Sequence, residues 1–263
     1  MEKQNKQEPG KRQKEQRKQE SQKESEMLTN SWEDELFQAK HAAAREIVVR
    51  LLRELNGFYI VKTGHGFLRF VESRIKTPES ICGKLKRKGY PVDFDTAVEQ
   101  LNDLSGVRCI CYSVKEIYWV ARQIGEDSRF TIIKAKDYIR KPKKNGYESY
   151  HIVMEVPVPG DMIEEKLSGK QLTNQVSEKK SGKCPKQKNN KGSKLTGDQM
   201  VRVELQLRTM IMDAWAGMDN RVSYKKENEI SPEMTKRIEK YAKIGRRLDK
   251  LIQRTLEEEV LDV

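Results

Sequence analysis

The sequence predicts an α+β fold in which strands and helices are mixed along one domain, with a long helix at the C-terminus. Residues 201–208 alternate apolar and polar side chains without a break, as a strand with one buried face does. Residues 36–55 repeat apolar side chains at helical spacing, and residues 232–255 repeat them over a longer stretch. Strand and helix periods in one chain favour a sheet packed against helices.

The first folded element is predicted to be a helix that starts close to Ser31. The run from Ser31 to Asp34 resembles a capping box, and Leu36 opens the apolar repeat. Asn56 and Gly57 are typical of a helix end, so the helix is expected to stop there. This predicts a helix of about five turns before the first strand.

The middle of the chain predicts an alternation of short elements. Thr77-Pro78-Glu79 is typical of a helix start, because proline is favoured at the first helical position. The expected strands are 67–76, 106–112, 130–136, 150–156 and 201–208. The expected helices are 78–89, 93–102, 114–125, a short helix around Trp215, and a long helix from Ser231-Pro232-Glu233. The long helix carries one stripe, predicted to be core or subunit contact: Met234, Ile238, Tyr241, Leu248, Ile252 and Thr255.

Two segments differ in composition from the rest of the chain. Residues 1–30 are rich in Lys, Glu and Gln, which predicts a disordered charged tail before a domain of residues 31–263. Residues 160–199 contain no aromatic side chain and many lysines, which predicts a flexible Lys-rich insertion between two strands. The tail or the insertion is a candidate RNA contact, although a solvated basic loop explains the same composition.

Charge and cysteine content indicate the kind of partner and the cellular compartment to expect. The net charge is +12 and charged residues make up 35% of the chain, which favours an anionic partner such as a nucleotide or nucleic acid. The four cysteines form no CxxC pair, so we expect reduced thiols and a cytoplasmic location. No signal peptide starts the chain and no run of about 18 apolar residues is present, so no membrane association is expected.

The segment 137–151 concentrates ligand-binding chemistry. It contains basic side chains, an Asn145-Gly146 turn, Tyr147 and His151 between two expected strands. Cations bind phosphate, glycine permits a close backbone approach, and an aromatic ring can stack on a base. An exposed basic hairpin is the simpler reading of the same residues.

A second cluster of polar residues is predicted to bind polyphosphate and a metal ion. Cations before and within the helix at Pro78 suit phosphate groups, because a helix N-terminus also attracts anions. Asp103 and Glu204 lie at or on strands, and a carboxylate pair without zinc ligands fits Mg²⁺ with a nucleoside triphosphate. Each carboxylate has an ordinary alternative, a turn cap for Asp103 and a cross-strand ion pair for Glu204. No GxxxxGK[ST] loop is present.

Four motifs in this order resemble the synthetase domain of the RelA/SpoT family, over about residues 35–258 without the insertion. They are Arg74-Ile-Lys-Thr-Pro-Glu-Ser80, Asp103-Leu-Ser-Gly-Val-Arg108, Asp137-Tyr-Ile with Pro142-Lys-Lys-Asn-Gly-Tyr-Glu-Ser-Tyr-His151, and Val203-Glu-Leu-Gln-Leu-Arg-Thr209 with Trp215-Ala216. The length is similar to that of the small alarmone synthetases, which have a single synthetase domain. The resemblance implies a nucleotidyltransferase-like fold with a mixed five-stranded sheet flanked by helices.

The resemblance also implies a reaction and a role for each residue. The reaction is Mg²⁺-dependent transfer of pyrophosphate from ATP to the 3′-hydroxyl of GTP or GDP, giving (p)ppGpp and AMP. Asp103 and Glu204 would hold the metal and carry the catalysis, with Glu204 accepting the hydroxyl proton. The ATP-binding residues would be Arg74, Lys76, Lys84, Arg108 and Lys136. The guanine-nucleotide residues would be Lys143, Asn145, Tyr147 (by stacking), His151 and Gln206.

The chain departs from the family pattern after Trp215. The family usually carries Glu-His a few residues later, where this sequence has Asp219-Asn220. Two further readings therefore stand beside the first: the same fold acting on a tRNA 3′ end, or a degenerate module that binds nucleotides without turnover. No hydrolase signature precedes the synthetase motifs, so we expect synthesis without degradation. Relatives of this size are commonly homotetramers, and the stripe on the last helix fits either that or internal packing.

Overall fold

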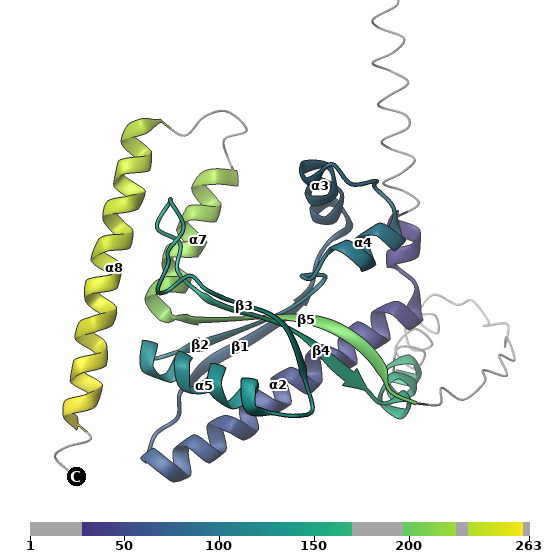
Figure 1. The fold of residues 1–263 in the computed structure, drawn as a ribbon, viewed down its shortest axis with the longest axis horizontal. Helices are drawn as coiled ribbons and strands as arrows, with labels where there is room; N and C mark the ends of the chain where they lie inside the picture. Colours follow the sequence, from purple (N-terminus) through teal and green to yellow (C-terminus); the bar gives the residue numbers. More distant parts are fainter. Residues whose placement is uncertain (1–27, 170–196, 225–230, 260–263) are drawn as a thin grey trace, which may run out of the picture.

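The computed structural model describes residues 28–169, 197–224 and 231–259, and its centre is a five-stranded sheet in the order β1-β2-β5-β4-β3 (Figure 1). The strands are β1 (Leu68–Ile75), β2 (Ser105–Cys111), β3 (Thr131–Asp137), β4 (Tyr150–Val158) and β5 (Gln199–Thr209). β2 and β5 run parallel, and every other neighbouring pair is antiparallel. The predicted mixed five-stranded sheet of an α+β fold is therefore confirmed.

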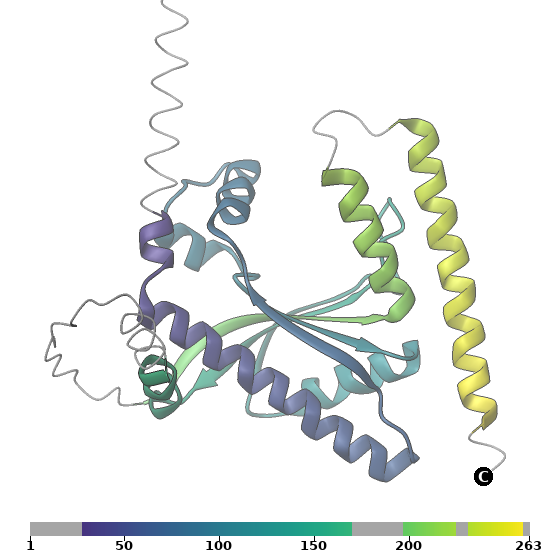
Figure 2. The ribbon, with the colours of Figure 1, turned by 180° about the vertical axis from the view of Figure 1, so that it is seen from behind.

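Helices lie on both sides of this sheet. The helices are α2 (Glu35–Thr63), α3 (Pro78–Lys88), α4 (Phe94–Gln100), α5 (Val114–Glu126), α7 (Met210–Tyr224) and α8 (Pro232–Glu259). α2 and α5 cover one face, whereas α3 and α4 lie at one end of the opposite face and α7 at the other (Figures 1 and 2). α8 runs alongside α7. The opposite face is thus covered by helices at its two ends.

The core lies between the sheet and the α2–α5 layer. Val203, Leu205 and Leu207 of β5 are fully buried and pack with Val107 of β2 and Met154 of β4. These residues come from alternate positions of their strands, so the intervening side chains project to the opposite face. The predicted division of β5 into an apolar and a polar face is confirmed, and the polar face is where a site can form.

α2 begins and ends later than its sequence signals indicate. Asp34, and not Ser31, is the N-cap, and its Oδ1 accepts a hydrogen bond from the Phe37 amide at 2.7 Å. The predicted stop at Asn56-Gly57 is wrong, because the helix continues to Thr63 and ends at Gly64, which has φ +82°. The side chain of Asn56 instead accepts a hydrogen bond from the Leu68 amide at 2.9 Å, so it joins the helix to β1.

The two segments with unusual composition are shorter than predicted, because one end of each is helical and packed against the domain. Residues 28–32 are helical, and Leu28 is buried beside Trp32, so packing begins before residue 31. Residues 160–169 form a helix whose Ile163 is fully buried in the main core. Residues 1–27 and 170–196 lie outside the described residues, and their predicted flexibility and RNA contacts stay predictions.

The apolar stripe predicted on α8 divides into two. Ile238 is buried beneath α7, together with Ala242. Tyr241 and Leu248 are 47% and 43% exposed, so these members of the stripe are not core. The reason is that, in the described residues, α8 packs mainly against α7. The oligomeric state stays a prediction.

Cys82, Cys109 and Cys111 are buried, and the sulfur atoms of Cys109 and Cys111 lie 3.9 Å apart, so these two form no disulfide with each other. Cys184 lies outside the described residues. Within those residues, each helix is either too short or too polar to span a bilayer.

Candidate active site

The polar face of the sheet carries two adjacent rows of aligned side chains. Both rows cross the strands in the order β1, β2, β5, β4, β3. The first row is Glu72, Arg108, Gln206, His151 and Lys136, and the second is Arg74, Gly106, Glu204, Val153 and Lys134. Directly paired positions on neighbouring strands share a face and lie close together. The register therefore gathers residues from five separate strands into one surface.

Asp103 lies just before β2 and binds two lysines. Its Oδ2 is 2.6 Å from Lys76 Nζ and 2.6 Å from Lys84 Nζ. Burial alone would raise the pKa of Asp103, but the two lysines outweigh it and hold the pKa below its ordinary value. The carboxylate is therefore ionised at neutral pH. Its other oxygen, Oδ1, is buried with no hydrogen-bond partner among the described residues.

The start of β2 beside Asp103 is anchored to α2. Ser105 is fully buried, and its Oγ lies 2.8 Å from His41 Nδ1. Arg45 Nη1 donates to the same Oγ at 3.2 Å. Burial lowers the pKa of His41 to about 4, and the charges of Arg45 and Lys40 act in the same direction. The neutral imidazole therefore acts as a fixed hydrogen-bond partner that positions the Asp103 segment.

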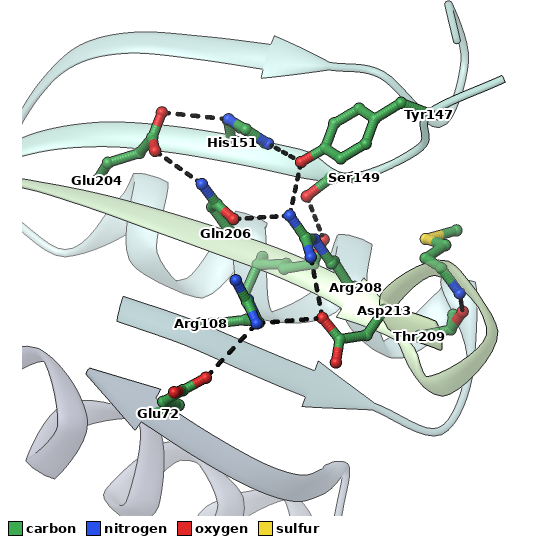
Figure 3. Close-up of polar contacts among 12 residues, drawn as sticks. Glu72, Arg108, Tyr147, Ser149, His151, Glu204, Gln206, Arg208, Thr209 and Asp213 are labelled. Carbon is green, nitrogen blue, oxygen red and sulfur yellow. Dashed lines mark hydrogen bonds and ion pairs between the residues drawn. The ribbon is translucent and has the colours of Figure 1, made fainter. Parts of the chain in front are cut away.

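Glu204 is held on β5 by two residues of the adjacent row. Its Oε1 lies 3.2 Å from His151 Nδ1, and its Oε2 accepts a hydrogen bond from Gln206 Nε2 at 2.8 Å (Figure 3). Burial raises the pKa of Glu204 and the charge of Asp103 adds to that effect, but His151 and Gln206 outweigh both and lower the pKa overall. Glu204 is therefore ionised at neutral pH and has a fixed orientation.

A chain of contacts continues from Glu204 to the opposite end of the site (Figure 3). His151 Nε2 lies 2.8 Å from the hydroxyl of Tyr147, which also accepts a hydrogen bond from Arg208 Nη2 at 2.8 Å. Arg208 Nη1 donates to Asp213 Oδ1 at 2.9 Å, and the same oxygen is 3.5 Å from Arg108 Nη1. The polar groups predicted for the two nucleotides are thus physically connected.

The loop between β3 and β4, residues 138–149, presents Tyr147 beside this network. Lys143 Nζ lies 4.6 Å from the centre of the Tyr147 ring, and the Arg208 guanidinium lies 5.3 Å from it. Lys143 is exposed whereas Arg208 is 5% exposed, so Lys143 is the cation that can move aside for a base. Asn145 Nδ2 donates to Asp219 Oδ2 at 3.0 Å, which joins the loop to α7.

The structure brings most of the predicted site residues into direct contact. Asp103 binds Lys76 and Lys84. Glu204, His151, Gln206 and Tyr147 form one hydrogen-bonded group, and Arg108 lies in the register row of His151 and Gln206. Arg74 and Lys136 are exposed, at the β1 and β3 edges of the sheet. Lys143 and Asn145 lie in the loop.

Two residues of the network were not assigned a role from the sequence. Arg208 lies on the polar face of β5 in step with Glu204 and Gln206, so the strand alternation already indicated that it faces the site. Its use as the link between Tyr147 and Asp213 depends on the tertiary fold. Asp213 is in the first turn of α7, and no local pattern distinguishes it from a surface acid.

The two carboxylates fit a divalent cation that prefers oxygen ligands. Asp103 Oδ1 is a buried acceptor with no donor among the described residues, and Asp103 and Glu204 are close enough for their charges to interact. Within the described part of the chain there is no cluster of three or more His, Cys, Asp or Glu side chains of the kind that holds a metal alone. Mg²⁺ suits such a site, because it takes one or two carboxylates and completes its shell with phosphate oxygens and water.

Known sequences are similar to this chain over most of its length. The family model "Region found in RelA / SpoT proteins" matches residues 73–229. The chain is 30% identical over 222 residues to GTP pyrophosphokinase YwaC of Bacillus subtilis, covering 84% of this chain and 89% of YwaC. It is 26% identical to GTP pyrophosphokinase YjbM of the same organism, with 85% and 87% covered.

Solved structures agree with the fold. Small alarmone synthetase 2 of Bacillus subtilis superimposes with a TM-score of 0.64 at 28% identity, over 86% of this chain and 99% of that one. Small alarmone synthetase 1 of the same organism, bound to its product pppGpp, gives a TM-score of 0.65 at 24% identity, over 87% and 98%. The family model covers more than half of the chain and all four sequence motifs begin within it, so the protein belongs to the RelA/SpoT family.

Proposed function

We propose that this protein is a GTP pyrophosphokinase that transfers pyrophosphate from ATP to the 3′-hydroxyl of GTP or GDP. The observation that carries this proposal is the placement of two ionised carboxylates, Asp103 and Glu204, between a group of cations and the Tyr147 loop on one face of the sheet. Relatives named GTP pyrophosphokinase, similar over most of their length, support it.

The ATP phosphates are assigned to the cations at the β1–β2 end of the site. Lys76 and Lys84 bind Asp103, and Arg74 and Arg108 lie in neighbouring register rows. The α3 N-terminus beside them, capped by Thr77, adds a favourable field for anions. Phosphate oxygens compete with Asp103 for its two lysines, so ATP binding leaves Asp103 Oδ2 available to a cation. Lys136 is assigned a supporting role from the opposite edge.

The guanine nucleotide is assigned to the other end of the site. Tyr147 offers its ring to the base, while Lys143 and Asn145 in the same loop contact the nucleotide. His151 and Gln206 are paired in the row beside Glu204, both contact its carboxylate, and they direct the ribose toward it. Holding two substrates in line is worth on the order of 7–11 kcal/mol of the barrier, so positioning is the main contribution of this surface.

In the proposed reaction the 3′-oxygen bonds to the β-phosphorus of ATP, the bond from that phosphorus to the α–β bridging oxygen breaks, and AMP leaves. The 3′-hydroxyl proton goes to a carboxylate oxygen of Glu204. The low pKa of Glu204 keeps it in the form that can accept a proton, although it also limits its strength as a base. Orientation by His151 and Gln206 is therefore as important as basicity.

Asp103 and Glu204 are the residues that would hold Mg²⁺. When bound, the ion supplies neutralisation of the charge that develops on the transferred phosphates. Asp103 suits this role because its Oδ1 has no other partner in the described residues.

The test is a nucleotide assay with ATP labelled in its γ-phosphate, Mg²⁺, and GTP or GDP. We expect a labelled guanosine product together with an equal amount of AMP. Asp103→Asn and Glu204→Gln should each make no such product, while their thermal unfolding midpoints stay close to that of the wild type. Asp127→Asn is the matched control, because among the described residues the Asp127 side chain pairs only with Arg129, two positions away. Label appearing on added tRNA would move the acceptor to RNA. No transfer to either acceptor would contradict the proposal and implicate Asp219 and Asn220.

A further inference from the structure

Four consecutive residues of the 138–149 loop are each held by α7 or α8. The pairs are Asn145 with Asp219, Gly146 with Ala242, Tyr147 with Trp215, and Glu148 with Arg246. Two of the four partners, Ala242 and Arg246, are one turn apart on α8. The loop that presents Tyr147 to the site is therefore supported from behind by a helix that contributes no residue to the site itself.

Among these four contacts between the loop and the helices, the pair of Glu148 and Arg246 is the ion pair. Arg246 Nε lies 2.6 Å from Glu148 Oε1, and the Glu148 side chain is 8% exposed. The contact is an ion pair, and among the described residues Arg246 Nε has no partner in good hydrogen-bond geometry. The cavity behind it holds only about 10 Å³, so the helix and loop are closely packed and leave no room for a ligand.

We propose that Arg246 is a positioning residue for the guanine nucleotide, acting through Glu148 to hold the 138–149 loop with Tyr147 facing the site. The proposal rests on the guanine-binding role proposed above for this loop. Glu148 immediately follows Tyr147, so movement of its carboxylate moves the backbone that carries the ring. Loss of the pair leaves a buried charge without its partner, which is costly, and the loop is the part that can move to relieve it.

The ion pair is sensitive to pH near neutrality. Burial raises the pKa of Glu148 to about 7, with Arg246 opposing the rise. The other charges that act on Glu148 are Asp249, which raises its pKa, and Lys250, which lowers it, both from α8. The α7 side of the contact carries the uncharged side chains of Ile211, Met212 and Trp215. The pair is therefore complete above about pH 7 and is lost as Glu148 is protonated below it.

The experiment compares Arg246→Met with Arg247→Met in steady-state kinetics. Arg247 is the next residue on α8 and is exposed, so it matches the charge removed without touching the loop. We expect Arg246→Met to raise KM for the guanine nucleotide on the order of tenfold, about 1.4 kcal/mol, with KM for ATP unchanged. In the wild type the same KM should rise as pH falls from 8 to 6, and Arg246→Met should remove that dependence.

A double-mutant cycle with Glu148→Gln tests whether the pair is the cause. If Arg246 acts through Glu148, the double variant binds guanine nucleotide no worse than Arg246→Met alone. Additive losses, equal changes in both KM values, or a purely lower kcat would overturn the proposal.

Amide hydrogen exchange in the absence of nucleotide gives a readout that does not need turnover. We expect faster exchange across residues 138–149 in Arg246→Met than in Arg247→Met, with the sheet unchanged. Equal exchange in the two variants would overturn the positioning role. If the wild type makes no guanosine product, the proposed function fails, whereas the exchange result still decides whether Arg246 orders the loop.

Discussion

The hydroxyl of Tyr147 links Arg208 to the residue that holds Glu204. It accepts a hydrogen bond from Arg208 Nη2 at 2.8 Å, because arginine can only donate, and it lies 2.8 Å from His151 Nε2. The other ring nitrogen of His151, Nδ1, lies 3.2 Å from Glu204 Oε1. Tyr147 therefore has two separable parts: a ring proposed to stack on the base, and a hydroxyl that contacts the residue holding Glu204.

This separation predicts different effects for two substitutions at Tyr147. Tyr147→Phe keeps the ring and removes the hydroxyl, so kcat should fall several-fold while KM for the guanine nucleotide changes little. Tyr147→Ala removes the ring as well, and since base–aromatic stacking is worth about 1–3 kcal/mol, that KM should rise on the order of 5- to 150-fold. Steady-state kinetics with GTP varied at saturating ATP measures both. Identical kinetic changes in the two variants would refute the separation.

The sequence predicted best the residues on a strand, because alternation along the strand determines the face on which each side chain lies. Glu204 and Gln206 follow directly from the pattern of residues 201–208, and the register confirms that they share a face with Arg108 and His151. The contact between Asn145 and Asp219 was not predictable, because 74 positions separate the two residues and only the return of α7 over the loop brings them together. Local patterns give a side chain's face, whereas its partners require the tertiary fold.

At the scale of elements, the docking of α8 on the loop depends on a glycine. Gly146 has φ +91°, and a Cβ built there would lie 2.5 Å from the Ala242 Cβ. Both the backbone conformation and the space therefore require glycine at this position. The same residue that permits the turn also permits α8 to approach.

Gly146→Ala is expected to lower the free energy of unfolding by about 2–4 kcal/mol, from left-handed strain and overpacking together. Gly64→Ala is the matched control, since Gly64 has φ +82° but open space around it, and it should cost only about 1–2 kcal/mol. Denaturant unfolding measures both variants. Adding Ala242→Gly to Gly146→Ala should recover the part of the unfolding free energy that is lost through the clash. If none is recovered, the clash is not the cause of the loss.

A buried carboxyl on the same helix, α8, predicts a pH-dependent stability. Asp249 is 4% exposed, accepts a hydrogen bond from Thr209 Oγ1 at 3.0 Å, and has its pKa raised by burial to about 6. Because the folded-state pKa exceeds the unfolded value near 4, the native state binds more protons between about pH 4 and 6. Its contribution to stability is therefore present at low pH and is lost as pH rises through 6.

Asp249→Asn should remove this dependence. The amide keeps an oxygen that accepts from Thr209 and carries no charge at any pH. Relative to the wild type, the variant should gain on the order of 1–3 kcal/mol of unfolding free energy as pH rises from 4 to 7. Urea unfolding at several pH values provides the measurement. Parallel curves for the two proteins across this window would place the titration elsewhere.

At the scale of the whole molecule, the two halves of the site lie at opposite ends of one face of the sheet. Lys84, which binds Asp103, is in α3, and the loop that carries Tyr147 is bonded to α7. These two helices lie at opposite ends of the polar face (Figure 1), and Glu204 is on β5 between them. Strand and helix types were predicted well because each has a periodic pattern. The α2 end and residues 160–169 were missed because tertiary packing of Asn56 and Ile163 overrides a local helix stop and a polar composition.

The helix at residues 160–169 changes where the chain can be shortened. A deletion of residues 162–198 looks neutral from composition, but it removes Ile163, which is fully buried, and Lys166, which pairs with Glu46 of α2. Losing a buried isoleucine costs about 2–5 kcal/mol, whereas an exposed loop replacement usually costs far less.

A deletion of residues 170–196 keeps every contact described for the domain. We expect the shorter deletion to retain the wild-type unfolding free energy within about 1 kcal/mol and the longer one to lose at least about 2 kcal/mol, as measured by urea unfolding. Equal stability of the two would mean that Ile163 and Lys166 are dispensable, and Ile163→Ala in the full chain would then also be silent.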